Sequence, residues 1–429
     1  MEILISAVGT TDPISNNRDA ALLHIARTYR PEKIVLVYSE EMLIKQDLIE
    51  QAIFSIEDYH PDVTIESTIL KNDEVYLFDK MYEVMGQIVE KYSGIEHQLI
   101  LNLSSGTPQV ISALFALNRI NDYNTQAIQV ATPNKSANRP YIQLSSDEEK
   151  CLFTENKDNQ NDYENRTIKD EAEKFNQSLI KRHLRNLISS YDYLAAEELV
   201  TKKEYNNLLS KKKLSFLRAT LNDFVKVFKT QAILTDIQDY PLTDVEKKAL
   251  NYFLMIEVLK ERGQVADVLI KSKSYVEFII EEKIKKDYPN LIKYDGALPK
   301  LNEEYKDFEE ILDFIDLEFK KAKGIENEEG RIYSPQSTLN LLSYENILTF
   351  YQVSPDLLKS LKVITSLNSE RNKVAHGLSE IDGKLVNSKK LNQTIDTLRF
   401  VLQATFEIED YYFGYYQKIN DKLLDLLRS

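Results

Sequence analysis

Three residues whose side chains suit chemistry at a phosphate group stand within six positions of one another in the stretch NSERNKVAHGLSE, residues 368–380. They are Arg371, Asn372 and His376. Histidine has an ordinary pKa close to neutrality, so His376 suits general acid or general base work. The guanidinium group of Arg371 stays charged, and its planar fork matches phosphate oxygens. The alternative interpretation is a histidine that interacts with the C-terminal end of a helix dipole.

A second group of polar residues follows two apolar runs in the N-terminal third of the chain. Gly-Thr-Thr comes directly after EILISAV, and NLSSGTPQ follows QLIL. A helix that begins with Thr at its N-cap and Pro at its first position presents free N–H groups, which favour an anion such as phosphate. The candidate ligand-binding residues in these two loops are Gly9, Thr10, Thr11, Asn102, Ser104, Ser105, Gly106, Thr107 and Gln109.

Both loops have a simpler interpretation, which is a tight turn followed by a helix cap. A third loop, TPNKSANRP, adds Lys135 and Arg139 as candidates that reach the same crevice, and its alternative is an ordinary solvated loop. The second loop is not GxGxxG, and no P-loop lysine follows it, so a dinucleotide redox cofactor is disfavoured.

The elements that must position the two loops alternate between strand and helix patterns over residues 1–145. Short β-branched runs such as EILISAV, KIVLVYS and TQAIQVAT are separated by segments with helical spacing. This alternation predicts an α/β Rossmann-like N-terminal domain with a mostly parallel sheet. In common doubly wound strand orders the first and fourth strands are neighbours, which would bring both loops to one crevice.

The rest of the chain is predicted to be helical. Residues 146–166 are polar and lack apolar periodicity, so they are predicted to form a linker. Strand patterns almost vanish afterwards, which predicts a helical connecting region over residues 167–262 and an all-α domain over residues 263–429. In that domain, helical spacing leads into the first motif and Gly377 ends the helix, so Asn372 and His376 would share one face.

Composition narrows the function classes. The chain of 429 residues has 68 acidic and 54 basic residues, a net charge of −14, which disfavours a protein that coats duplex nucleic acid. Its one cysteine excludes a disulfide framework, and its five histidines do not stand at metal-ligand spacing, so no metal or other cofactor is expected. The N-terminus lacks the basic leader of a signal peptide, and no apolar run approaches membrane length, so a cytoplasmic protein is expected.

The two motifs together resemble a known family. RNKVAHG near the end of a helical region resembles the HEPN ribonuclease motif, in which an arginine and a polar residue precede a histidine by three variable residues. The segments SAVGTTDP and LNLSSGTPQ resemble the CARF domain, a Rossmann fold that senses cyclic oligoadenylates. In this order the two resemble the Csm-type auxiliary ribonucleases of type III CRISPR systems over essentially the whole chain.

The resemblance implies a cyclic-oligoadenylate-activated, metal-independent endoribonuclease that cleaves single-stranded RNA in antiviral defence. It implies His376 as the acid or base, Arg371 as the stabiliser of charge on phosphorus and Asn372 as an orienting group. The RNA 2′-hydroxyl would be the nucleophile, giving a 2′,3′-cyclic phosphate and a 5′-hydroxyl. The resemblance also implies a homodimer with a composite catalytic cleft.

Among activators, the resemblance favours cyclic hexa-adenylate over tetra-adenylate, and the sensor domain is a candidate for slow self-cleavage of this ring. The alternatives are a non-catalytic CARF-type sensor that recruits a partner protein and a HEPN toxin that needs no activator. No stable binding to duplex DNA and no membrane association are expected.

Overall fold

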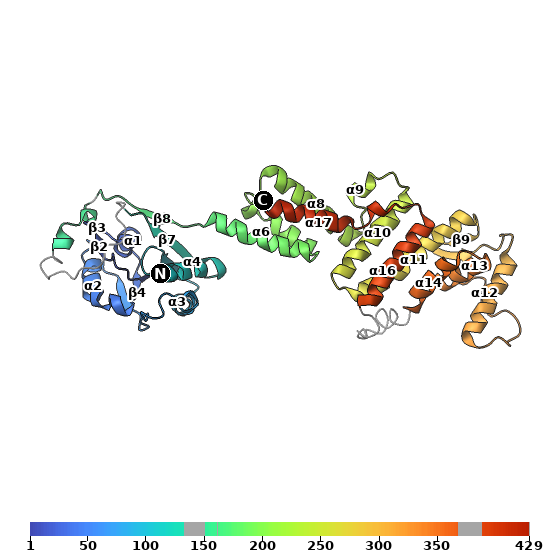
Figure 1. Ribbon diagram of the computed structural model, residues 1–429, viewed down its shortest axis with the longest axis horizontal. Coiled ribbons are helices and arrows are strands. Elements are labelled where there is room, and N and C mark those ends of the chain that lie inside the picture. Colours follow the sequence, from blue (N-terminus) through green and yellow to red (C-terminus); the bar gives the residue numbers. More distant parts are fainter. Residues whose placement is uncertain (133–150, 161, 368–387, 429) are drawn as a thin grey trace. The chain divides into compact units, whose positions relative to one another are not determined.

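The computed structural model describes residues 1–132, 151–160, 162–367 and 388–428, and these form two compact units (Figure 1). The N-terminal unit comprises Met1–Asn176 and the C-terminal unit Gln177–Ser429.

The N-terminal unit is built on a six-stranded sheet, which confirms the predicted fold class (Figure 1). All neighbouring strands are parallel except the last pair. The strands, in their order across the sheet, are β5 (Asp62–Ile65), β4 (Lys33–Val37), β1 (Glu2–Ala7), β6 (Gln98–Asn102), β7 (Thr125–Val130) and β8 (Thr167–Lys169).

Helices cover both faces of this sheet, so its central strands are apolar on both sides. Ile3 and Ile5 of β1 belong to the core under α3 (Phe78–Tyr92) and α4 (Pro108–Ile120). Leu4, between them, belongs to the opposite core under α1 (Ala21–Tyr29) and α2 (Gln46–Phe54), which follows the 3-10 helix η1 (Glu40–Lys45). The apolar run of β1 is therefore uninterrupted because its side chains are buried alternately in the two cores.

The N-terminal unit extends past the segment predicted to be a linker. Residues 151–160 and 162–166 pack in this unit, with the 3-10 helix η2 (Lys157–Asn159), and β8 then pairs antiparallel with β7. Asp158 and Arg166 of this segment are buried. The polar residues of this segment were predicted to be solvated, but Asp158 takes part in a buried network of ion pairs. Its partners Arg18 and Asp19 lie in a small hairpin formed by β2 (Ile14–Ser15) and β3 (Arg18–Asp19).

The C-terminal unit is helical, as predicted, around one large apolar core. Its chain enters through α6 (Glu173–Ser189), which begins in the N-terminal unit. The other helices of the described residues are α7 (Tyr193–Thr201), η3 (Lys203–Tyr205), α8 (Lys211–Thr230), α9 (Thr235–Gln238), α10 (Asp244–Glu261), α11 (Val265–Asp287), α12 (Phe308–Lys323), α13 (Leu341–Phe350), α14 (Pro355–Ser366), α16 (Ser388–Thr405), η4 (Asp410–Tyr412) and α17 (Tyr415–Arg428).

Two features of this unit were not predicted from the sequence. A hairpin of β9 (Ile292–Asp295) and β10 (Leu298–Leu301) interrupts the helices, with Gly296 at a φ of +61° in its turn. The last helix, α17, returns to the start of the unit, where Tyr416 stacks on Tyr193 of α7. Within the described residues, every helix is too short or too polar to cross a lipid bilayer.

Candidate functional site

The two polar loops meet at one edge of the parallel sheet. β1 and β6 are adjacent, which confirms that the first and fourth predicted strands are neighbours. A Cβ atom added to Gly9 would lie 3.0 Å from the backbone nitrogen of Gly106. Gly106 has a φ of +99°, and a Cβ atom there would lie 2.9 Å from the Cβ of Ala7. Only glycine at both positions lets the first loop (residues 9–11) approach the second loop (residues 102–109) this closely.

A buried lysine and a buried aspartate hold the first loop in place. The Lys45 ammonium donates hydrogen bonds to the carbonyl oxygens of Thr10 at 2.6 Å and Asp12 at 2.8 Å, and a longer one to that of Gly9 at 3.4 Å. The Asp12 carboxylate accepts from the N–H groups of Gly9 at 2.8 Å and Leu22 at 3.3 Å. The loop is thus fixed by side chains that lie beneath it.

Burial sets the electrostatics of this pair. Burial raises the pKa of the Asp12 carboxyl, although hydrogen bonds from Gly9, Ser105 and Leu22 and the charge of Lys45 act against the rise. Burial also lowers the pKa of the Lys45 ammonium, against the attraction of Asp12. Hydrogen bonds in such a setting are stronger than at a solvated surface, so the loop backbone is held firmly.

In the second loop, the predicted ligand donors Asn102 and Ser104 are engaged within the protein. The Asn102 amide is fully buried, donates to Ser6 Oγ at 2.8 Å and accepts from the N–H of Ser104 at 2.8 Å. Ser104 Oγ accepts from the N–H of Val130 at the end of β7. These contacts give Asn102 a positioning role that shapes the loop.

Thr107 is the N-cap of α4, as predicted. Its Oγ1 accepts from the N–H of Val110 at 3.4 Å and donates to the carbonyl of Val75 at 3.1 Å. Pro108 has no N–H, and the N–H groups of Val110 and Ile111 are bonded to Thr107, so the Gln109 N–H is the donor that the first turn of α4 keeps at its positive dipole end. Gln109, one residue into this helix, is half-buried.

The exposed side chains of the first loop are polar. Thr10 and Thr11 are exposed on the first loop, while Ser105 is buried behind it. Together with the start of α4, the threonine hydroxyls form a surface that suits an anionic ligand. Lys135 and Arg139 lie outside the described residues, so their place beside this surface stays a prediction.

Sequence reasoning missed the two residues that hold the first loop. Asp12 stands directly after Thr11 in GTTDP, and Lys45 ends the apolar run MLIK. A lysine within an apolar helical stretch is the signal that would have identified it, because a buried ammonium needs several acceptors.

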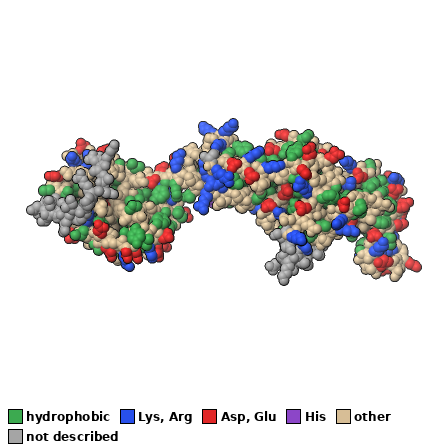
Figure 2. Space-filling view, in the orientation of Figure 1, with side chains coloured by type: hydrophobic (Ala, Val, Ile, Leu, Met, Phe, Trp, Pro, Cys, Tyr) green, Lys and Arg blue, Asp and Glu red, His purple; other side chains and the backbone are tan. Residues whose placement is uncertain are grey.

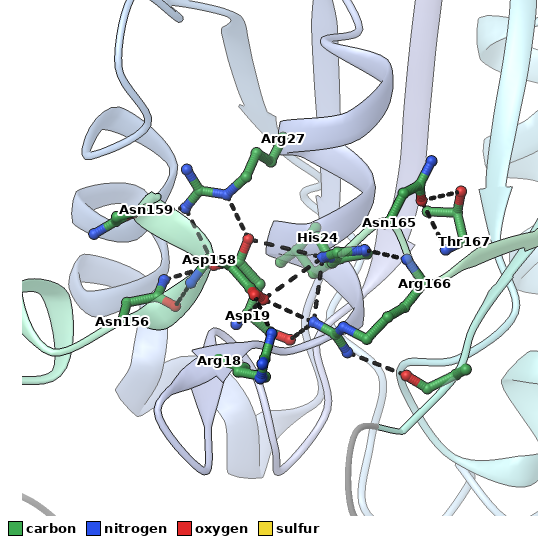
Figure 3. Close-up of polar contacts among 12 residues, drawn as sticks. Arg18, Asp19, His24, Arg27, Asn156, Asp158, Asn159, Asn165, Arg166 and Thr167 are labelled. Carbon is green, nitrogen blue, oxygen red and sulfur yellow. Dashed lines mark hydrogen bonds and ion pairs between the residues drawn. The ribbon is translucent and has the colours of Figure 1, made fainter. Parts of the chain in front are cut away.

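A second buried polar cluster ties the end of the N-terminal unit to its start (Figure 3). Asp19 accepts from Arg27 Nε at 2.6 Å, while Asp158 accepts from Arg18 at 2.9 Å and Arg166 at 2.8 Å. Burial acts to raise the pKa of Asp158, but hydrogen bonds from His24 and Asp19 and the charge of Arg166 outweigh it and hold this pKa well below its ordinary value.

The same cluster contains the one group among the described residues whose atoms are close enough to hold a metal ion, Asp19, His24 and Asp158. Its donor set does not favour a cation, because arginines already neutralise both carboxylates. His24 Nε2 accepts from the backbone N–H of Arg166 at 2.9 Å, so this nitrogen serves the segment before β8. The geometry indicates a structural cluster.

The predicted catalytic residues Arg371, Asn372 and His376 lie outside the described residues. The helices on either side of them in sequence are described: α14 ends at Ser366, α16 begins at Ser388, and the two helices pack against each other. The predicted helix that leads toward the motif is therefore present as far as α14.

Comparisons with known proteins identify a known domain in the N-terminal part of the chain and another in the C-terminal part. Residues 50–167 match the family model of the Csm6 CARF domain, and residues 229–424 match that of the Csm6 HEPN domain. The chain is 63% identical over 427 residues to the CRISPR system endoribonuclease Csm6 of Streptococcus thermophilus, covering 100% of both chains. It is 35% identical, again over the full length of both, to the endoribonuclease Csm6′ of the same organism.

The fold is also that of a solved relative. The structure of Enterococcus italicus Csm6 bound to cyclic hexa-2′-fluoro-hexa-dAMP superposes with a TM-score of 0.72 at 26% identity, and the match covers 99% of this chain and 100% of that one. With full-length identity well above the level that unrelated sequences share, the chain belongs to the Csm6 family of endoribonucleases, the auxiliary effectors of type III CRISPR systems that join a CARF domain to a HEPN domain.

Proposed function

We propose that this protein is a cytoplasmic endoribonuclease that is activated by a cyclic oligoadenylate. It cleaves single-stranded RNA without a metal ion. The observation that carries the proposal is the convergence of the two loops at one edge of the CARF sheet, where exposed threonines lie beside a helix start. The candidate ligand-binding residues named from the sequence lie in or next to this crevice, or outside the described residues.

The activator we favour is cyclic hexa-adenylate. Its phosphates suit the positive end of α4, and its hydroxyl groups suit the side chains of Thr10 and Thr11. The Enterococcus italicus relative, whose bound ligand is a cyclic hexanucleotide analogue, supports a ring of this size. Asn102, Lys45 and Asp12 serve by holding the loops that contact the ring.

Cleavage takes place at Arg371, Asn372 and His376. His376 moves a proton during attack of the RNA 2′-hydroxyl on the adjacent phosphorus, and Arg371 stabilises the charge that develops on the phosphate oxygens. Asn372 orients the histidine or the phosphate. The products are a 2′,3′-cyclic phosphate and a 5′-hydroxyl, and a homodimer supplies two copies of the motif to one cleft.

The CARF crevice also cuts its activator slowly. A cyclic oligoadenylate carries a 2′-hydroxyl beside every phosphate, and alignment of the hydroxyl with phosphorus supplies about 7–11 kcal/mol of the barrier. No histidine lies in either loop, so this reaction is slow and limits the duration of activation. Linear products formed from cyclic hexa-adenylate by the His376→Ala variant would test this step.

The experiment that tests the proposal combines purified protein with labelled RNA. RNA cleavage should be weak without activator and strong with cyclic hexa-adenylate. Equal cleavage in both conditions would indicate an activator-independent ribonuclease, and binding of the ring without cleavage in either would indicate a sensor that acts through a partner protein.

A further inference from the structure

Positive charge is concentrated in one part of this acidic chain. Residues 177–230 contain 11 Lys and Arg against 5 Asp and Glu, a net charge of +6 in a protein whose total is −14. Figure 2 shows Lys and Arg side chains gathered over α6 and α8 of Figure 1. Residues 177–228 of this segment lie between the residues that match the CARF and HEPN family models, so ten of its 11 Lys and Arg residues fall outside both matches.

A groove of about 1000 Å³ lies in this region, between the end of α7 and the first half of α8. One face of α8 lines it, with Lys211, Ser215, Arg218 and Asn222 at helical spacing. The opposite wall is the connection from α7 to α8, which contributes further hydroxyl and amide groups. The only acidic side chain among the lining residues is Glu197.

Arg218 is fixed at the base of the groove. Its Nε and Nη2 both donate to the carbonyl oxygen of Val200, at 2.9 and 2.8 Å, and Nη2 also donates to Asn206 Oδ1 at 3.0 Å. These acceptors are neutral, and no ion pair of Arg218 is found among the described residues. The guanidinium thus keeps its charge in a defined orientation, and because Nε and Nη2 are engaged, Nη1 is the nitrogen that would meet a phosphate oxygen.

The start of α8 adds to this positive field. Lys211, Lys212 and Lys213 are exposed in its first turn, where the helix dipole is also positive, and the side chain of Ser210 makes no capping hydrogen bond. Cations at this end of a helix are unfavourable unless an anion lies nearby.

We propose that this α7–α8 groove binds the sugar–phosphate backbone of single-stranded RNA, outside the catalytic motif. The inference rests on the proposed ribonuclease function, because the groove would contribute part of the binding of its RNA substrate. Lysine and arginine meet the phosphates, and the amides of Asn206, Asn207 and Asn222 meet phosphate and 2′-hydroxyl groups. None of the lining residues is aromatic, so the groove follows the backbone without reading bases.

The test uses the full-length protein with His376→Ala, which prevents cleavage during binding measurements. Lys211→Glu with Lys212→Glu reverses one exposed charge that lines the groove and one exposed charge next to it in the first turn of α8. The matched control is Lys286→Glu with Lys306→Glu, which makes the same change at two exposed lysines elsewhere in the C-terminal unit. Circular dichroism and the melting temperature check that each double variant is folded.

Fluorescence anisotropy with labelled oligouridylate at several salt concentrations gives both affinity and its salt dependence. The groove variant should bind at least about 10-fold more weakly, and its plot of log K against log salt should be shallower by roughly 0.7 for each phosphate that the variant no longer neutralises. The control should match the parent protein. Parent-like affinity and slope in the groove variant would overturn the proposal.

Activity assays separate this proposal from the proposed function. In the enzyme with His376 intact, the groove variant should raise KM for RNA and leave kcat unchanged, with the same activator requirement. Salt-sensitive RNA binding that depends on Lys211 and Lys212 in a protein without ribonuclease activity would support the groove and refute the ribonuclease. Absence of any RNA binding by the parent protein would overturn both.

Discussion

At the residue scale, the candidate activator site depends on a few buried polar side chains. Lys45 is 2% exposed and bonds to the backbone of the first loop, so its removal leaves carbonyl groups without a donor. Lys45→Met should lower the free energy of unfolding by roughly 1–3 kcal/mol. Urea denaturation measures this change, and Lys71→Met, at an exposed lysine, is the control. Equal stability of Lys45→Met and the wild type would show that the ammonium does not hold the loop.

The low pKa of Asp158 gives a prediction for acid. A carboxyl whose pKa is lower in the folded than in the unfolded protein stabilises the fold above its ordinary pKa, near 3.9, and this stabilisation is lost as pH falls further. Asp158→Asn should therefore be less stable than the wild type at pH 5–7, and the difference should narrow below about pH 4. Denaturation followed across this range provides the measurement. A difference that does not change with pH would contradict the ion-pair account of the cluster.

Individual residues also show where sequence reasoning stops. Gly9, Gly106 and Thr107 could be identified because turns and helix caps require particular residue types. Asn102 was expected to contact ligand, but it is buried and bonds to Ser6, a contact between two strands that no local pattern encodes. Lys45 was missed for the same reason, since its partners are 33 to 36 positions away in the chain.

At the scale of elements, the alternation of strands and helices was predictable because long apolar periodicity dominates it. The short strands were not. β8 has three residues, and contacts of Arg166 with Asp158 and Asp19 hold the segment that precedes it. The β9–β10 hairpin has four-residue strands, too short to stand out between long helices.

The packing of α10 against α16 and α17 contains an acid with a raised pKa. Burial raises the pKa of Glu257 to about 7, although Arg399 and the backbone of Gly414 act to lower it. An acid whose pKa is raised in the folded protein destabilises the fold as pH rises from its ordinary pKa toward 7. The difference in unfolding free energy between Glu257→Gln and the wild type should therefore be more positive at pH 8 than at pH 5. Urea denaturation of both proteins at pH 5 and pH 8 measures this difference in unfolding free energy. A difference that is the same at both pH values would contradict the raised pKa of Glu257.

At the scale of the whole molecule, the proposed function requires that a ligand in the CARF domain change the activity of the HEPN domain. A ligand shifts such an equilibrium only by its difference in affinity for the two states. Thr10→Val with Thr11→Val removes two exposed hydroxyls from the crevice, so more activator should be needed while cleavage without activator stays the same. Activator titrations of RNA cleavage measure this shift, with Thr68→Val as an exposed control. A wild-type activation curve would place the ligand elsewhere.

The central claim is that His376 carries metal-free, activator-dependent RNA cleavage, and one measurement tests it most directly. Initial rates of RNA cleavage are compared for the wild type and His376→Ala, with saturating cyclic hexa-adenylate and in excess EDTA. General acid–base catalysis contributes roughly 10²–10⁴-fold, so the variant should lose at least that factor. Wild-type activity should be unaffected by EDTA, and both proteins should bind the activator equally. A variant that cleaves RNA at the wild-type rate, or a wild type that EDTA silences, would contradict the account.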